Sequence, residues 1–136
     1  MMQRPDWFDE DLFPFESHTV EIDGSVVHYV DEGEGVPLLM LHGNPTWSFL
    51  YRKLISGLSG TFRCIALDYP GFGLSTAPAG YTHTAAEHSA VVEGFVDQLG
   101  LDGQCDDIHH GGDRHHSDSR KRDGGQQRHS GCPGLW

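Results

Sequence analysis

The sequence has few of the features that mark secreted, membrane-spanning or nucleic-acid-binding proteins. Its 136 residues include only 3 Cys, which form neither a CxxC pair nor a compact even-numbered framework, so we expect reduced thiols. No run approaches the roughly 18 apolar residues of a membrane span, and residues 1–10 lack the apolar core of a signal peptide. With 9 Lys and Arg against 20 Asp and Glu, the chain also lacks the basic surface that nucleic acids require. We therefore expect a cytoplasmic protein with neither a nucleic-acid nor a membrane partner.

Apolar residues are nearly absent after residue 101. Residues 1–101 contain 45 hydrophobic residues, whereas residues 102–136 contain five. So little apolar surface cannot offset the roughly 1–2 kcal/mol per residue that ordering a backbone costs. We therefore divide the chain into a folded part, 1–101, and a disordered tail, 102–136. The tail also lacks Ala, Val and Thr. This composition is expected if the codons of a buried strand were read out of phase, so we favour a frameshift or a misplaced gene boundary. A genuine disordered extension is the alternative.

The first elements of the folded part are expected to be strands. Two runs rich in β-branched residues, 19–22 and 26–30, flank the turn signal Asp23-Gly24 and predict a hairpin. His28, inside the second run, is interpreted as a surface or strand-edge residue. Residues 38–41 are apolar at every position, which indicates a strand covered on both faces of a parallel sheet.

Two helices are expected to alternate with strands in the remainder of the folded part. Apolar residues recur at helical spacing over 47–58, and residues 62–67 are typical of a further strand. A capping box at Thr84-x-x-Glu87 predicts a second helix that stops at Gly100. A hairpin followed by strand, helix, strand and helix is the opening of an α/β fold. The expected apolar face of the first helix comprises Leu50, Leu54, Ile55 and Leu58.

Two stretches that follow the expected strands carry the strongest functional signal. Residues 41–52 read Leu-His-Gly-Asn-Pro-Thr-Trp-Ser-Phe-Leu-Tyr-Arg, and residues 68–75 read Asp-Tyr-Pro-Gly-Phe-Gly-Leu-Ser. Together with Tyr-Val-Asp-Glu-Gly at 29–33, they resemble the haloalkane dehalogenases, a branch of the α/β-hydrolase family. The resemblance extends over residues 13–101, and it implies an incomplete α/β-hydrolase sheet followed by the tail.

The resemblance assigns one residue directly to chemistry. In this family the Asn that matches Asn44 donates a side-chain N–H to the departing halide, and its backbone lies at the oxyanion site. An Asn that only closes the turn is the alternative. Epoxide hydrolases, the alternative enzyme class on this fold, usually carry an aromatic residue at this position. The residues expected to support the two loops are His42, Gly43, Pro45, Trp47, Asp68, Gly71 and Gly73.

The rest of the family's catalytic machinery has no match in the sequence. The nucleophilic Asp is expected near residue 110, where His110 stands. Asp113 lacks both a preceding apolar strand and a following Trp-Gly-Gly, and the family's base and acid come from later segments. We therefore expect a truncated and inactive chain with no catalytic residue. The alternative from another functional class is a non-enzymatic fragment or pseudogene product.

The remaining expectations concern ligands and partners. The resemblance implies a small halogenated hydrocarbon as substrate and neither a metal nor an organic cofactor. The His pairs at 109–110 and 115–116 could hold a transition metal weakly, but no supporting residues would fix them, so no physiological metal site is expected. Apolar strands without flanking partners predict self-association through an exposed sheet.

Overall fold

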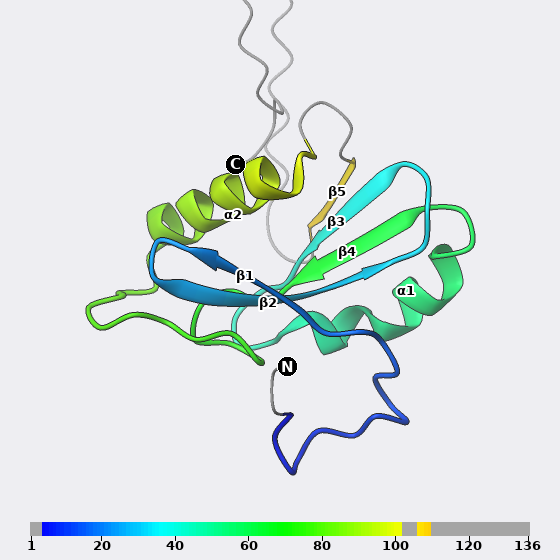
Figure 1. Cartoon of the computed structure of the whole chain (residues 1–136), viewed down its shortest axis with the longest axis horizontal. Coiled ribbons are helices and arrows are strands. Elements are labelled where there is room, and N and C mark those ends of the chain that lie inside the picture. Colours follow the sequence, from blue (N-terminus) through cyan, green and yellow to red (C-terminus); the bar gives the residue numbers. More distant parts are fainter. Residues whose placement is uncertain (1–3, 102–105, 110–136) are drawn as a thin grey trace, which may run out of the picture.

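A computed structural model describes residues 4–101 and 106–109. Its strands form one mixed sheet in the order β1-β2-β4-β3-β5, with α1 (Arg52–Leu58) below one face and α2 (Ala85–Leu99) above the other (Figure 1). Each face has its own apolar core, one built around the buried Phe95 of α2 and the other around the buried Ile55 of α1. The predicted α/β class is therefore confirmed.

The predicted hairpin is present as β1 (His18–Ile22) and β2 (Ser25–Glu32). Asp23 and Gly24 in its turn both have positive φ, 47° and 79°, which is the geometry that a two-residue turn between twisted strands requires. The two strands pair antiparallel, and β2 also pairs antiparallel with β4.

The centre of the sheet is formed by β3 (Pro37–Leu41) and β4 (Arg63–Leu67), which pair in parallel. All five residues of β3 are buried, as its continuous apolar sequence predicted, because helices cover both faces of the sheet. The connection between the two strands contains α1. Their carboxyl ends consequently lie at the same edge of the sheet.

The first helix differs from its prediction. It begins as the 3-10 turn η1 (Ser48–Tyr51) and continues as α1. Tyr51 and Ile55 are buried against the sheet, whereas Leu50 and Leu54 are 39% and 45% exposed. Tyr51 lies on the inner face because its hydroxyl donates to the carbonyl of Leu41, at 2.6 Å.

The capping box of the second helix is confirmed. The Thr84 hydroxyl accepts from the amide of Glu87, and the Glu87 carboxylate accepts from the amide of Thr84. Gly100 ends α2 with a φ of 64°, a left-handed conformation that suits glycine. Hydrogen bonds from Thr82 and then Thr84 lower the pKa of the Glu87 carboxyl, so it stays charged at the positive end of the helix.

A further strand, β5 (Asp106–His109), pairs in parallel with β3. The prediction of irregular structure throughout 102–136 is wrong at these four residues, because backbone pairing with β3 gives order that the composition did not predict. Residues 102–105 and 110–136 lie outside the described part, and the frameshift hypothesis remains untested. In 4–101 and 106–109, no helix is long and apolar enough to cross a membrane.

Candidate functional site

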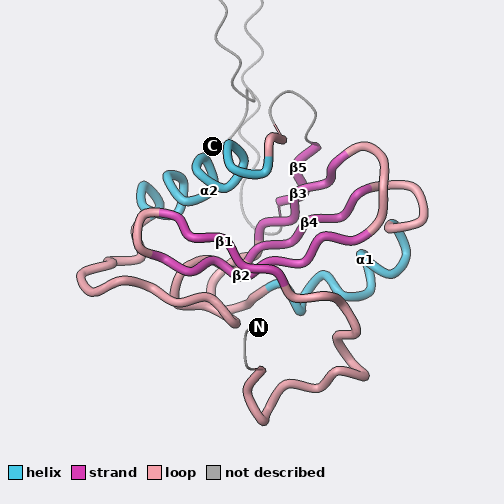
Figure 2. The backbone as a smooth tube through the Cα atoms, viewed as in Figure 1, coloured by secondary structure: helices cyan, strands magenta, loops and turns pink. Residues whose placement is uncertain are grey.

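Two loops meet at the carboxyl edge of the central strands. One follows β3 and contains His42 to Trp47; the other follows β4 and begins at Asp68 (Figure 2). The amide of Tyr69 donates to Nε2 of His42 at 3.0 Å, which links the two loops directly. In open α/β sheets, ligands bind outside this edge.

Asn44 lies at the exposed tip of the first loop. The loop is closed behind it by the amide and hydroxyl of Thr46, which donate to the carbonyl of Gly43 at 2.9 and 2.7 Å, and the Asn44–Pro45 peptide bond is cis. Within 4–101 and 106–109 the Asn44 side chain has no hydrogen-bond partner. Its amide is exposed and unpaired within this part of the chain.

His42 is a buried support of this loop and is 4% exposed. Its Nδ1 donates to the carbonyl of Gly43 at 2.9 Å while Nε2 accepts from Tyr69, so the neutral ring fits both hydrogen bonds. Burial lowers the pKa of His42, outweighing the hydrogen bond to Gly43 and the charge of Asp68. The imidazole ring therefore remains neutral, and both of its nitrogens are engaged in hydrogen bonds.

Asp68 organises the second loop from a completely buried position. Its carboxylate accepts from the amide of Ser48, at the start of η1, at 2.7 Å and from the amide of Leu74 at 3.0 Å. A third donor is Nδ1 of His28 in β2, 2.9 Å away. Because these donors occupy both carboxylate oxygens, Asp68 positions the loops and is not available as a nucleophile.

His28 is the residue that the sequence interpretation missed. It is 0% exposed, and its Nε2 lies 3.0 Å from the hydroxyl of Ser17, in the segment before β1. The backbone of His28 also holds the second loop: its amide donates to the hydroxyl of Ser75, and its carbonyl accepts from the amide of Asp68. An interpretation as a surface or strand-edge residue is wrong, since both faces of β2 are covered here.

The glycines of the second loop allow close approach. Gly73 has a φ of 52°, and a Cβ there would overlap the carboxylate of Asp68 and lie 2.9 Å from Cβ of Trp47. Gly71 has a φ of 83°, and a Cβ there would lie 2.6 Å from the ring of His83. Any side chain at Gly73 would therefore separate the two loops.

A ring cluster surrounds the junction of the loops. Tyr69 packs edge-to-face on His42, with centroids 4.9 Å apart. Burial, and then the neighbouring Tyr51 and Tyr81, raise the pKa of Tyr69 to about 12. The Tyr69 hydroxyl is thus protonated at any neutral pH, and it offers a hydrogen-bond donor rather than an anion.

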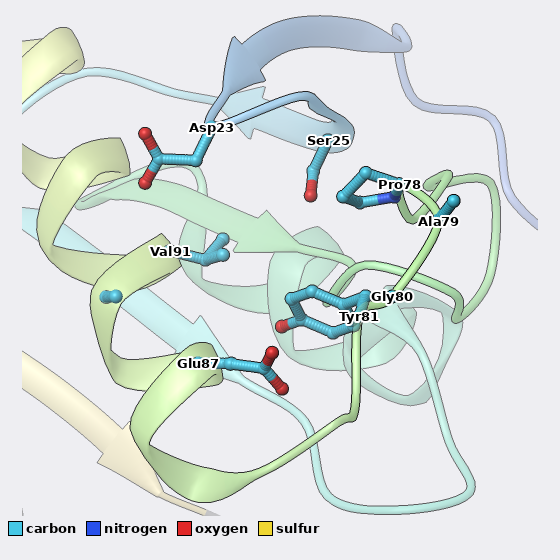
Figure 3. Close-up of a pocket in the computed structure, with 9 residues that line it drawn as sticks. Asp23, Ser25, Pro78, Ala79, Gly80, Tyr81, Glu87 and Val91 are labelled. Atoms are coloured by element: carbon cyan, nitrogen blue, oxygen red, sulfur yellow. The ribbon is translucent and has the colours of Figure 1, made fainter.

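A cavity lies away from the loop that carries Asn44. It measures about 260 Å³ and lies between the hairpin turn, the loop at Pro78 to Tyr81 and the first turns of α2, with Asp23 and Glu87 on its walls (Figure 3). No residue of the loop from His42 to Trp47 lines it. Position 110, near which the nucleophile is expected, and Asp113, which was not assigned that role, both fall outside the described residues. In 4–101 and 106–109, no group of three or more His, Cys, Asp or Glu could hold a metal ion.

A family model described as the alpha/beta hydrolase fold matches residues 36–104, which include both central strands and both loops. The chain belongs to this hydrolase family. Haloalkane dehalogenase 2 of Mycobacterium tuberculosis H37Rv is 54% identical over 94 residues, which cover 69% of this chain and 33% of that protein. The chain thus spans about a third of the length of the curated relatives that it matches.

Other relatives of this hydrolase have different names. Cis-3-alkyl-4-alkyloxetan-2-one decarboxylase of Shewanella oneidensis MR-1 is 42% identical over 92 residues, covering 66% of this chain and 29% of that protein. The solved structure of the epoxide hydrolase CorEH is 34% identical with a TM-score of 0.59, covering 63% of this chain and 30% of that one. The shared part of the fold therefore occurs in proteins named for three different reactions.

Proposed function

We propose that this chain is part of a haloalkane dehalogenase-type hydrolase. The reaction is hydrolytic cleavage of a carbon–halogen bond in a small halogenated hydrocarbon, giving an alcohol, a halide ion and a proton. No metal or organic cofactor is required, because a carboxylate and water can carry out both displacement steps.

The free amide of Asn44 is the observation that carries the proposal. Displacement of a halide by a carboxylate creates an anion, and fixed N–H donors stabilise that developing charge in a site that excludes water. The Asn44 side chain is exposed at the carboxyl edge of the sheet and has no partner in the part of the chain that the structure describes. The 54% identity to a haloalkane dehalogenase supports the same reaction.

The loops around Asn44 provide the rigidity that such a donor needs. His42 accepts the amide of Tyr69 in the other loop, and Asp68 accepts the amide of Ser48 in η1 and that of Leu74 in its own loop, at distances of 2.7 to 3.0 Å. His42 is only 4% exposed and Asp68 is fully buried, and both are engaged in these hydrogen bonds, so we assign neither as a reacting group. We assign them as positioning residues.

The described residues would not catalyse the reaction alone. Within residues 4–101, Asp68 is the only carboxylate that is fully buried, and its oxygens are already occupied. We therefore propose that the 136-residue polypeptide is inactive by itself. A non-enzymatic fragment is the corresponding alternative from another functional class.

An epoxide hydrolase-type reaction is the second candidate, supported by the similarity to a solved epoxide hydrolase. There the leaving oxygen stays attached to the substrate and must be protonated, which requires an acidic donor rather than an amide N–H. Asn44 fits halide release better, because a halide needs hydrogen bonds and no proton.

A chimera tests the proposal. The matching third of Mycobacterium tuberculosis haloalkane dehalogenase 2 is replaced by the aligned 94 residues of this chain, and halide release from 1-bromobutane is compared with diol formation from 1,2-epoxybutane. We expect halide release, and we expect Asn44→Ala to lower kcat about 100-fold, as for loss of one anion-stabilising donor.

Lys53→Gln, on the outer side of α1, is the control. Diol formation without halide release would favour the epoxide hydrolase. Halide release from the unmodified 136-residue chain would refute its proposed inactivity.

A further inference from the structure

An aromatic cavity between the N-terminal segment and η1 has no role in the proposed reaction. Its volume is about 250 Å³, and its lining includes five aromatic side chains and one carboxylate. These residues are Trp7, Phe8, Phe13, Trp47, Phe49 and Asp9.

The rings form walls at different angles. Trp47 and Phe49 stack with centroids 5.5 Å apart and 15° between their planes, so they present one extended wall. Trp7 stands edge-on to Trp47, at 5.8 Å and 88°. Phe13, which is 1% exposed, packs against both Trp47 and Phe49 and closes the cavity on its inner side. The result is a corner of aromatic surface that is open to solvent.

The lining itself carries one negatively charged residue. Asp9 is the only ionisable residue in the lining. Its Oδ1 accepts from the amides of Asp11 and Leu12, at 2.9 and 3.3 Å, which fixes the carboxylate in a turn. Aromatic faces add to this potential, because a ring is negative above its plane.

Two of the aromatic rings that line the cavity already contact arginine side chains of the chain itself. The guanidinium of Arg4 lies 4.6 Å from the ring centroid of Phe8, and that of Arg52 lies 4.0 Å from the centroid of Phe49. Neither arginine lines the cavity. Cation binding by these aromatic faces is therefore a property that the structure displays.

We propose that this cavity binds a small quaternary ammonium compound. Aromatic corners next to a carboxylate are suited to such ligands, because the positive charge is spread over methyl groups that contact ring faces. A primary ammonium would need hydrogen-bond acceptors for its N–H groups, and the lining offers only Asp9. A neutral apolar ligand would cover the Asp9 carboxylate without compensating its charge. Although Trp47 belongs to the loop that carries Asn44, the proposal does not rest on the halide chemistry there.

Tryptophan fluorescence of the full chain provides the test. Trp136→Phe leaves Trp7 and Trp47, both in the cavity, as the only emitters among the 3 Trp of the sequence. We titrate this protein with choline and with 3,3-dimethylbutan-1-ol, the neutral compound of the same shape. Saturable quenching by choline is expected, with an affinity about tenfold above that of the alcohol, between the values for an exposed and a desolvated cation–π contact.

Two variants show whether choline binding depends on the charge of Asp9 in the cavity or only on the net charge of the protein. Asp9→Asn keeps the acceptor of the turn and is expected to weaken choline binding severalfold, whereas the exposed Asp6→Asn leaves it unchanged. Trp7→Leu, at a side chain that is 61% exposed, should also weaken it, with far-UV circular dichroism showing that the fold is retained. Equal affinities for choline and the alcohol, equal effects of the two Asp variants, or no saturable signal would each overturn the proposal.

Discussion

Nδ1 of His28 lies 2.9 Å from Oδ2 of Asp68, and neither side chain has any solvent-exposed surface. The pair joins β2 to the loop after β4, 40 residues later in the chain. Asp68 also receives the first amide of η1, so three segments distant in sequence depend on one carboxylate. Through the amide of Ser48, the pair is connected to the residue that directly follows the loop carrying Asn44.

Asp68→Asn should strongly destabilise the fold. The amide cannot accept three hydrogen bonds and would place its own N–H group against the donors of Ser48, Leu74 or His28. Leaving a buried hydrogen-bonding group unpaired costs about 1–3 kcal/mol. Urea unfolding followed by circular dichroism measures the loss, with the exposed Asp97→Asn as control. Equal stability of the two variants would show that the buried pair is unimportant.

Gly73→Ala should cost more than Gly80→Ala. Both glycines have positive φ, 52° and 87°, so both substitutions carry the roughly 1 kcal/mol of a left-handed L-residue. Only at Gly73 would the new Cβ also overlap Asp68 and approach Trp47, whereas no atom lies within 4 Å of a Cβ at Gly80. The difference between the Tm values of the two variants measures the part of the destabilisation that is due to the steric overlap at Gly73. If both lower Tm equally, the close approach at Gly73 does not matter.

Stability should fall as the pH decreases below 6.5. Burial lowers the pKa of His42 from its ordinary value of 6.5, so the unfolded chain binds a proton at a higher pH than the folded chain. The contribution of neutral His42 is therefore complete above pH 6.5 and is lost as the pH falls toward the lower folded pKa.

The variant His42→Gln isolates this effect. Its side-chain oxygen can accept from the amide of Tyr69 but does not titrate, so its stability should decline less between pH 6.5 and 5 than that of the unmodified chain. Free energies of unfolding from urea titrations at several pH values give both curves. Parallel curves would contradict the role given to His42.

We also expect the chain to self-associate through the sheet. β1 and β5 are the outer strands of the described sheet, and outer strands offer unpaired backbone groups to other chains. Thr19→Lys places a charge on β1 that should reduce association, and Lys53→Gln on α1 should not. Sedimentation velocity over a range of concentrations measures both. A monomer at all concentrations would disprove this expectation.

Local patterns in the sequence predicted most of the elements correctly. The Asp23-Gly24 turn, the apolar run of β3 and the Thr84 capping box each depend on neighbouring residues, so each could be recognised without knowledge of the fold. The family resemblance likewise rested on continuous stretches, and the match of residues 36–104 to the hydrolase fold confirms it. The halide-binding role of Asn44 remains a prediction.

Features that depend on contacts between distant residues were not predictable. A histidine on a strand resembles a solvent-facing residue until its partner Asp68 is placed beside it. The inner face of η1 and α1 was misassigned because a 3-10 turn changes the helical register, which places Tyr51 inward and Leu54 outward. The pairing of β5 depends on the open side of β3, which composition does not reveal.

The strand order also has a consequence for synthesis of the chain. β2 pairs with β4 rather than with β3, the strand that follows it in sequence. When the hairpin leaves the ribosome, one side of β2 therefore remains unpaired until residues 63–67 have been made and α1 has formed. His28 spends the same interval without Asp68, so the newly made hairpin exposes a polar side chain that the finished fold encloses completely.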